Sequence, residues 1–332
     1  MVILLLCPST AVNGADVETG ILEIRVVDAA TDRPCPARLR IRDCLGLDHI
    51  PADSVSVPIA KDKWFVCSGR MRTNIIVGKA SLRIERGTEY RPVIEVIDIA
   101  ADTTARHEVK LERWIHMSEL GYASGENHLH VPGDGLSGML AAEDLNFGTS
   151  LSWWNGPKIE VDSARGCTYD LQYGNQSIPC SLCDVEVEHQ WGAVYLVGLP
   201  APLDILSNKR RSNLPFVRNA HEQKALVCYQ AGWFREVLID ALLGYVDVVN
   251  VCNNNFHRHK YQPRRQYANL LNVKGFPEYP NTPQGMLEMN FEAYYRLLNC
   301  GLRLAPVPGQ QLEPRRRPWD TIERTFGRSQ RI

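Results

Sequence analysis

The chain has 332 residues, with 37 Lys and Arg against 38 Asp and Glu, and a formal net charge of −1 at pH 7. Its 44% hydrophobic and 23% charged residues are typical of a soluble protein that buries a core. The balanced charge excludes a global attraction to nucleic acid or anionic lipid, and no later run is apolar enough to span a bilayer. We expect two domains and no nucleic-acid partner.

Residues 1–15 indicate export. Met1 to Cys7 form an apolar run, and small residues follow up to Ala15, as at the end of a secretory signal peptide. The first basic residue is Arg25, so the segment lacks a positive start, and a short buried strand is the alternative. We predict a secreted, periplasmic or cell-envelope protein.

The cysteines do not decide the compartment. The chain has ten, and they do not form the dense pattern of a disulfide scaffold. Cys180 and Cys183 form one CxxC, which is typical of redox sites and of half of a zinc site. No second CxxC accompanies it, so we favour loop cysteines or a local disulfide.

Residues 20–114 predict an all-β sandwich. The runs ILEIRVVDA, ARLRIRD, RPVIEVIDI and RHEVKLER alternate apolar and polar residues, and turn-forming residues separate them. None of these runs has catalytic spacing. We interpret this domain as an accessory or packing module.

The next region, residues 115–304, begins with an HxH motif. His128 and His130 are two positions apart, so on a strand both imidazoles point to the same face. Two imidazoles make half of a site for zinc, manganese or iron. The alternative is a pair of histidines on the solvated face of a surface strand.

Strands and helices then alternate. The runs AVYLVGL and VDVVNVCNN predict strands, and a helical pattern lies between them from about His221 to Leu243. This alternation favours a parallel sheet or barrel, in which functional groups collect at the carboxyl ends of strands. That rule selects the HxH motif, residues 153–155 and residues 253–259.

Several longer strings carry a family resemblance. GYASGENHLHVP, AAEDLNFGTSLSWWN, EHQWGAVYLVGL, GYVDVVNVCNNNFHRHKY and AYYRLLNCGLRL resemble PHP-domain metallohydrolases of the CehA/McbA-like branch. The first domain resembles the carboxypeptidase-regulatory-like sandwich. The resemblance implies an α+β multidomain protein: a β-sandwich, then a distorted β/α barrel that is incomplete at its C-terminus. It also implies divalent metals and hydrolysis of phosphoesters, other esters or carbamates in a small-molecule substrate.

The resemblance also implies roles for particular residues. His128, His130 and His257 are the expected metal ligands. Glu188 and His189 are expected to complete the shell or to move protons in catalysis. The expected substrate-binding residues are Trp153, Trp154, Asn155 and Asn255. The alternatives are that the two tryptophans plug the barrel mouth and that residues 253–255 form a turn after a strand.

The chain also departs from the family pattern. Ser152 to Asn155 stand where typical members have Thr-Asp-His, and Val307 to Gln310 replace a closing metal motif. These departures favour a second interpretation: a degenerate, non-catalytic barrel that binds a ligand or a cell-surface partner.

Residues 305–332 predict a basic tail rich in Pro and Arg. Its six arginines are not interleaved with aromatic residues in a regular pattern, so they do not predict nucleic-acid binding. One hypothesis is that a frameshift replaced the native C-terminus after about Leu304. The alternative is a natural disordered tail.

Overall fold

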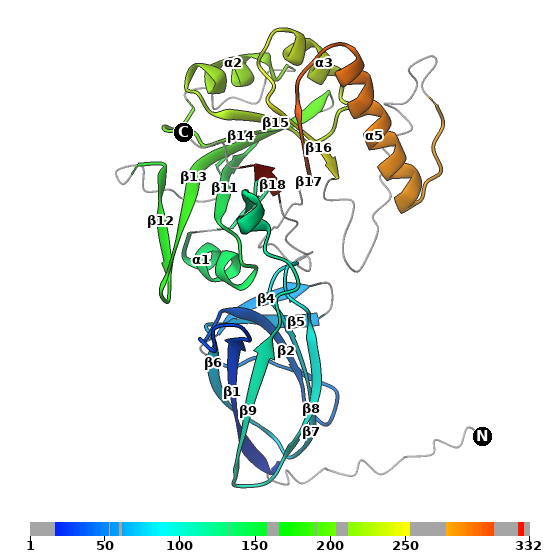
Figure 1. The fold of residues 1–332 in the computed structure, drawn as a ribbon. Coiled ribbons are helices and arrows are strands. Elements are labelled where there is room, and N and C mark those ends of the chain that lie inside the picture. Colours follow the sequence, from blue (N-terminus) through cyan, green and yellow to red (C-terminus); the bar gives the residue numbers. More distant parts are fainter. Residues whose placement is uncertain are drawn as a thin grey trace, which may run out of the picture.

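The computed structural model describes residues 17–52, 54–59, 62–131, 133–157, 166–189, 191–203, 212–252, 277–308 and 325–328. Two bodies, an N-terminal one and a larger C-terminal one, are joined through the segment that follows β9 (Figure 1). Among the described residues, no helix combines the length and the hydrophobicity needed to cross a bilayer.

The N-terminal body contains two β-sheets. One has the order β6-β1-β9, and the other has the order β4-β5-β2-β7-β8, with β3 paired to β2. The strands are β1 (Thr19–Asp28), β2 (Ala37–Arg42), β3 (Asp48–His49), β4 (Val55–Ile59), β5 (Asp62–Cys67), β6 (Arg70–Ile76), β7 (Gly78–Glu85), β8 (Val93–Ile99) and β9 (Thr104–Leu111).

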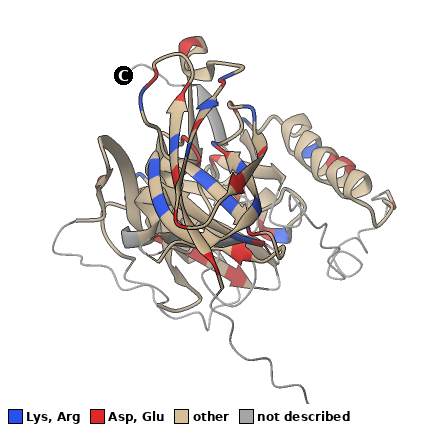
Figure 2. Ribbon diagram, turned by 90° about the horizontal axis from the view of Figure 1, so that it is seen from below, with Lys and Arg blue, Asp and Glu red and all other residues tan. Residues whose placement is uncertain are grey.

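One core lies between these two sheets. Leu22 and Ile24 of β1 pack in the same cluster as Leu39 of β2, Phe65 of β5 and Leu82 of β7. Burial alternates along β1, because successive side chains on a strand point to opposite faces. The outward positions carry charges of both signs, which Figure 2 shows interspersed over this body. The two sheets therefore form a sandwich with a polar exterior.

The C-terminal body is built on one nine-stranded sheet. Its order is β17-β16-β15-β14-β13-β11-β10-β18, with β12 paired to β13. Its strands are β10 (Tyr122–Glu126), β11 (Phe147–Trp154), β12 (Thr168–Tyr173), β13 (Gln176–His189), β14 (Gly192–Val197), β15 (Leu226–Tyr229), β16 (Val248–Cys252), β17 (Ala305–Pro308) and β18 (Thr325–Arg328). The helices are the 3₁₀-helix η1 (Met117–Leu120), α1 (Gly133–Ala142), α2 (Leu214–Glu222), α3 (Arg235–Leu242) and α5 (Pro283–Asn299).

The expected α+β fold with a distorted β/α barrel is wrong. Strand pairs β10/β11, β11/β13, β15/β16 and β16/β17 are parallel, but β13 pairs antiparallel with both β12 and β14, and β14 with β15. A β/α barrel needs a helical crossover between successive parallel strands. The described residues instead form a mostly β structure, a sandwich followed by a curled mixed sheet (Figure 1). The first four residues of the expected tail form β17.

The two faces of the mixed sheet differ. Val194, Val227 and Val249 point to one face, where they share a core with Phe216 of α2, Val237 of α3 and Leu297 of α5. Tyr195 and Cys228, which follow Val194 and Val227 in the chain, point to the opposite face, which lacks these three helices. Glu186 lies directly across from Tyr195 in the sheet, so it joins that second face.

The two bodies are packed together through α1. Trp64 and Val66 of β5 lie in one apolar cluster with Leu136 and Leu140 of α1. Buried and partly buried ion pairs border this cluster. Arg38 of β2 lies 2.5 Å from Glu143, and Arg86 and Arg113 each lie 2.5 Å from Asp144. Glu143 and Asp144 therefore join the sandwich to the larger body.

Candidate metal centre

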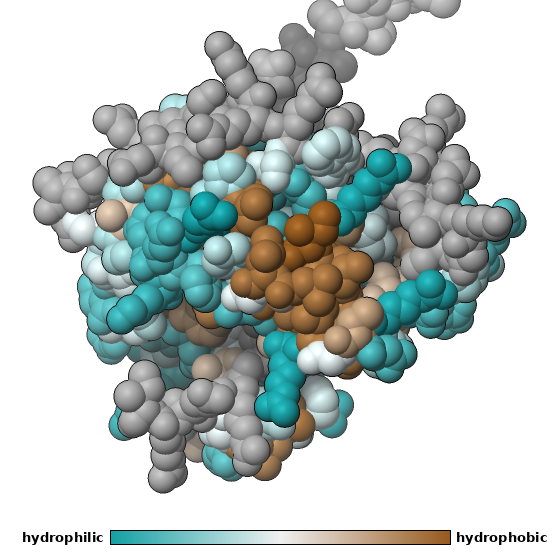
Figure 3. Space-filling view, turned by 90° about the horizontal axis from the view of Figure 1, so that it is seen from above, coloured by the Kyte–Doolittle hydropathy of each residue, from teal (hydrophilic) through white to brown (hydrophobic). Residues whose placement is uncertain are grey.

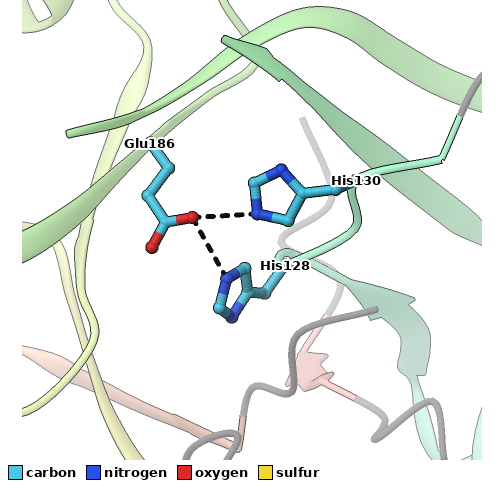
Figure 4. A group of neighbouring side chains, drawn as sticks. All are labelled: His128, His130 and Glu186. Atoms are coloured by element: carbon cyan, nitrogen blue, oxygen red, sulfur yellow. Dashed lines mark hydrogen bonds and ion pairs between the residues drawn. The ribbon is translucent and has the colours of Figure 1, made fainter. Parts of the chain in front are cut away.

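The HxH motif and one glutamate form a buried cluster. One ligand atom from each of His128, His130 and Glu186 can be chosen so that all lie within 4.8 Å of one another. Nε2 of His130 is 2.8 Å from Oε2 of Glu186, and Nε2 of His128 is 3.4 Å from the same oxygen. The three side chains converge from the segment after β10 and from β13 (Figure 4). Two imidazoles and one carboxylate are a known ligand set for zinc and for iron(II).

The neighbouring backbone sets the orientation of His130. Nδ1 of its ring is 3.1 Å from the carbonyl oxygen of Leu151 on β11. A carbonyl only accepts, so Nδ1 carries hydrogen, and a neutral ring then presents a lone pair at Nε2. The carboxylate oxygen of Glu186 that faces this lone pair is also an acceptor. A proton or a metal cation between the two atoms resolves that conflict. A backbone carbonyl on the distal ring nitrogen is a common feature of metal-binding histidines.

Glu126 holds the segment that presents His128. Its side chain is fully buried, and Oε1 accepts hydrogen bonds from the backbone N–H groups of Asn127, at 2.9 Å, and His128, at 3.0 Å. These bonds replace the strand pairing that ends with β10. Glu126 therefore positions the histidine backbone.

Glu186 is ionised in this cluster. Burial disfavours its charge, but when protons rather than a metal cation lie between Glu186 and the histidines, the attraction to His128 and hydrogen bonds from both histidines outweigh this effect and lower its pKa to about 2. The carboxylate therefore carries a full negative charge at neutral pH. It is the only one of the three ligands whose charge can balance that of a divalent cation.

Trp154 and Glu188 lie beside the cluster. The Trp154 ring centroid is 5.1 Å from that of His130, and Nε1 of Trp154 donates a 3.1 Å hydrogen bond to Oε2 of Glu188. Asn155 and Glu188 also bond reciprocally, Asn155 Nδ2 to the Glu188 carbonyl at 2.6 Å and Glu188 N–H to Asn155 Oδ1 at 2.9 Å. Glu188 thus fixes the indole that covers His130, and it does not belong to the three-ligand cluster.

Two of the other expected site residues point away from the cluster. His189 follows Glu188 on β13 and faces the opposite side, where its Nε2 lies 3.4 Å from Oε2 of Glu236 on α3. Trp153 is buried in the helix-covered core, with its ring centroid 6.3 Å from that of Phe216. The structure therefore gives Trp153 a packing position. Asn255 and His257 lie outside the described residues.

Sequence reasoning missed Glu186. Glu186 and Glu188 alternate with valines on β13, so both carboxylates share one face of the sheet. This alternation was the available signal, but it does not tell which of the two glutamates reaches the histidines. That choice follows from the pairing of β13 with β11, which aligns Glu186 with Trp154.

Comparison with known proteins identifies no family. No protein-family model matches the chain, and no curated protein matches it in sequence. Partial structural matches include the minor pilin GBS52 of Streptococcus agalactiae, with a TM-score of 0.23, 17% identity and coverage of 30% of this chain and 46% of that chain. Two others are the Bacillus anthracis TIE protein (TM-score 0.23, 16% identity, 34% of this chain and 19% of that chain) and the phospholipase PlaB of Legionella pneumophila (0.20, 11%, 29% and 25%). Each match spans less than half of either chain.

Proposed function

We propose that this protein is an exported, divalent-metal-dependent hydrolase of ester, phosphoester or related bonds in a small-molecule substrate. One observation carries the proposal: ligand atoms of His128, His130 and Glu186 converge within 4.8 Å in a buried setting. A divalent ion held there would supply a Lewis acid for hydrolysis. Zinc, manganese and iron are the metals that this donor set suits.

The residues around the ligands have supporting roles. Leu151 holds the His130 ring through its carbonyl, and Glu126 holds the His128 backbone. Trp154 lies against His130 and excludes water from one side of the ring. Buried ligands held by such partners lose little freedom when a cation binds, and this favours affinity.

Metal binding is the decisive test. Purified protein would be stripped with a chelator and titrated by calorimetry with Zn²⁺, Mn²⁺ and Fe²⁺. We expect near-stoichiometric binding of one of them, lost in His130→Ala and Glu186→Gln. His221→Ala, which removes an exposed histidine of α2, is the matched control and should bind normally. Equal binding by wild type and both cluster variants would reject the proposal.

A second function, ligand binding without turnover, is favoured by the burial of the cluster. His128, His130 and Glu186 are 0%, 3% and 1% exposed. Such burial suits a structural metal ion better than a catalytic one, because a catalytic ion must be accessible to substrate. The metal-loaded protein would be assayed with p-nitrophenyl acetate and p-nitrophenyl phosphate. Metal-dependent turnover lost in Glu186→Gln supports the hydrolase, and stoichiometric metal without turnover supports the binding protein.

A location outside the cytoplasm is part of the proposal. A disulfide joins Cys167, the residue before β12, to Cys183 on β13, and such bonds persist in oxidising compartments. The apolar N-terminal run of the sequence agrees with export. Fractionation of the native host is the test, and recovery of the protein in the cytoplasm alone would contradict this location.

A further inference from the structure

Helix α3 has an inverted distribution of side chains. Its inward face carries Glu236, Val237, Asp240 and Ala241, which include both acidic residues of the helix. Its outward face and its C-cap residue carry four large aliphatic side chains, and their exposed fractions are Leu238 39%, Ile239 57%, Leu242 64% and, at the C-cap, Leu243 54%. An exposed helix face normally carries polar residues. Figure 3, which views the molecule from the side of α2 and α3, shows hydrophobic residues gathered in one patch.

The spacing of the outward residues is that of a helix–helix contact. Leu238, Ile239, Leu242 and Leu243 are related by steps of one, three and four, so they form one continuous stripe along the helix. Contiguous exposed apolar stripes of this kind mark interaction sites in soluble proteins.

The charges at the ends of the stripe select the partner. Arg235 is exposed at its N-terminal end, and the last turn of α3 contains no basic residue to balance the negative end of the helix dipole. Asp247 follows shortly after the helix and adds an acidic residue near that negative end. An antiparallel second copy of α3 would place each Arg235 near the carbonyl end of the other helix. The N-terminal end of one helix is therefore complementary in charge to the C-terminal end of the other.

We propose that two copies of this chain associate through α3 about a two-fold axis. An axis between residues 240 and 241 sets Ile239 opposite the partner's Leu242 and Leu238 opposite the partner's Leu243. Every aliphatic residue of the stripe then contacts an aliphatic residue, as an isologous interface requires. This inference is independent of the proposed hydrolase activity.

The size of the patch predicts weak association. A standard stable interface uses about 20–30 residues on each side, and a single eight-residue helix with its flanks offers fewer. We therefore expect a dimer with a dissociation constant in the micromolar range. Its mass would be twice the 37.5 kDa of the chain.

Sedimentation equilibrium of the full-length protein from about 1 to about 200 µM tests the proposal. Wild type should shift from monomer to dimer over this range. Ile239→Lys and Leu242→Glu should each weaken self-association at least about tenfold, because each buries a charge against aliphatic side chains. Combining both substitutions should restore association, since residue 239 faces residue 242 of the partner subunit. Leu47→Lys, at a 61% exposed leucine of the sandwich, is the matched control and should dimerise normally.

Three outcomes would overturn the proposal. The first is a wild type that stays monomeric at the highest concentration. The second is a single variant that associates as strongly as wild type while its circular dichroism is unchanged. The third is monomeric wild type that binds phosphatidylcholine vesicles in a manner lost in Ile239→Lys, which would make the stripe a lipid-binding surface. Failure of the double variant to recover would overturn the antiparallel register.

Discussion

Nε2 of His130 lies 2.8 Å from Oε2 of Glu186, although 56 positions separate the two residues in the chain. The contact exists because β11 and β13 pair in parallel and because the Leu151 carbonyl turns the imidazole towards β13. The same carbonyl leaves Nε2 as the ring atom available to a cation. This pair therefore carries the metal proposal.

Glu186→Gln should weaken metal binding by at least about tenfold. The substitution preserves volume but removes the one negative charge among the three ligands, so cation binding loses its charge compensation. Thermal unfolding with and without Zn²⁺ measures this, because a ligand that binds only the folded state raises the melting temperature. A metal-induced rise of equal size in wild type and Glu186→Gln would contradict the assignment.

Glu126→Ala should destabilise the protein by about 1–3 kcal/mol, because the backbone N–H groups of Asn127 and His128 lose their buried acceptor. Urea unfolding measures the change. Glu126→Gln keeps one acceptor oxygen and should lose less stability. If Ala and Gln variants unfold at the same urea concentration as wild type, Glu126 does not hold the histidine segment.

Asp144→Ala should cost about 3–5 kcal/mol, since it leaves Arg86, which is buried, without its ionic partner between the two bodies. Arg113 loses the same partner. Chemical unfolding should show the loss. Asp98→Ala removes an aspartate from a surface pair with Lys79 and is the control, with an expected change of at most about 1 kcal/mol. Similar losses in the two variants would show that the Asp144 contacts do not join the bodies.

Because the pKa of Asp240 is raised, we expect the stability of the protein to depend on pH. Burial, as the largest influence, raises the pKa of its carboxyl from 3.8 to about 6, and the charge of Glu236 adds to the rise, although the hydrogen bond with Tyr229 opposes it. At a pH between these two pKa values, Asp240 keeps its proton in the folded chain and releases it in the unfolded chain. The free energy of unfolding should therefore fall as pH rises from about 4 to about 6 and then level off. Asp240→Asn should remove this component in urea unfolding, and an identical pH profile in both proteins would contradict it.

Reduction of the Cys167–Cys183 disulfide should lower stability by about 3 kcal/mol, because the bond closes a loop with a sequence separation of 16. Thermal melting with and without dithiothreitol measures the loss. Cys167→Ser should melt at the same temperature in both conditions, whereas Cys180→Ser, at a buried free cysteine, should keep the sensitivity of wild type to reductant. A wild type that melts at one temperature in both conditions would contradict a stabilising disulfide.

Features that depend only on neighbouring residues could be predicted from the sequence. The spacing of His128 and His130 follows from local alternation, and the period-2 pattern of β1 and β9 is a property of each strand alone. The pairing of the strands could not be predicted in this way, because it depends on contacts between distant segments of the chain. Periodicity does not distinguish a parallel from an antiparallel neighbour, so the strand–helix rhythm after His130 led to a barrel where the chain forms a mixed sheet. The place of Glu186 beside the two histidines also depends on pairing, because the register of β13 on β11 and β14 decides which glutamate reaches them. That register is a long-range choice, made when buried faces pack, and no local pattern encodes it.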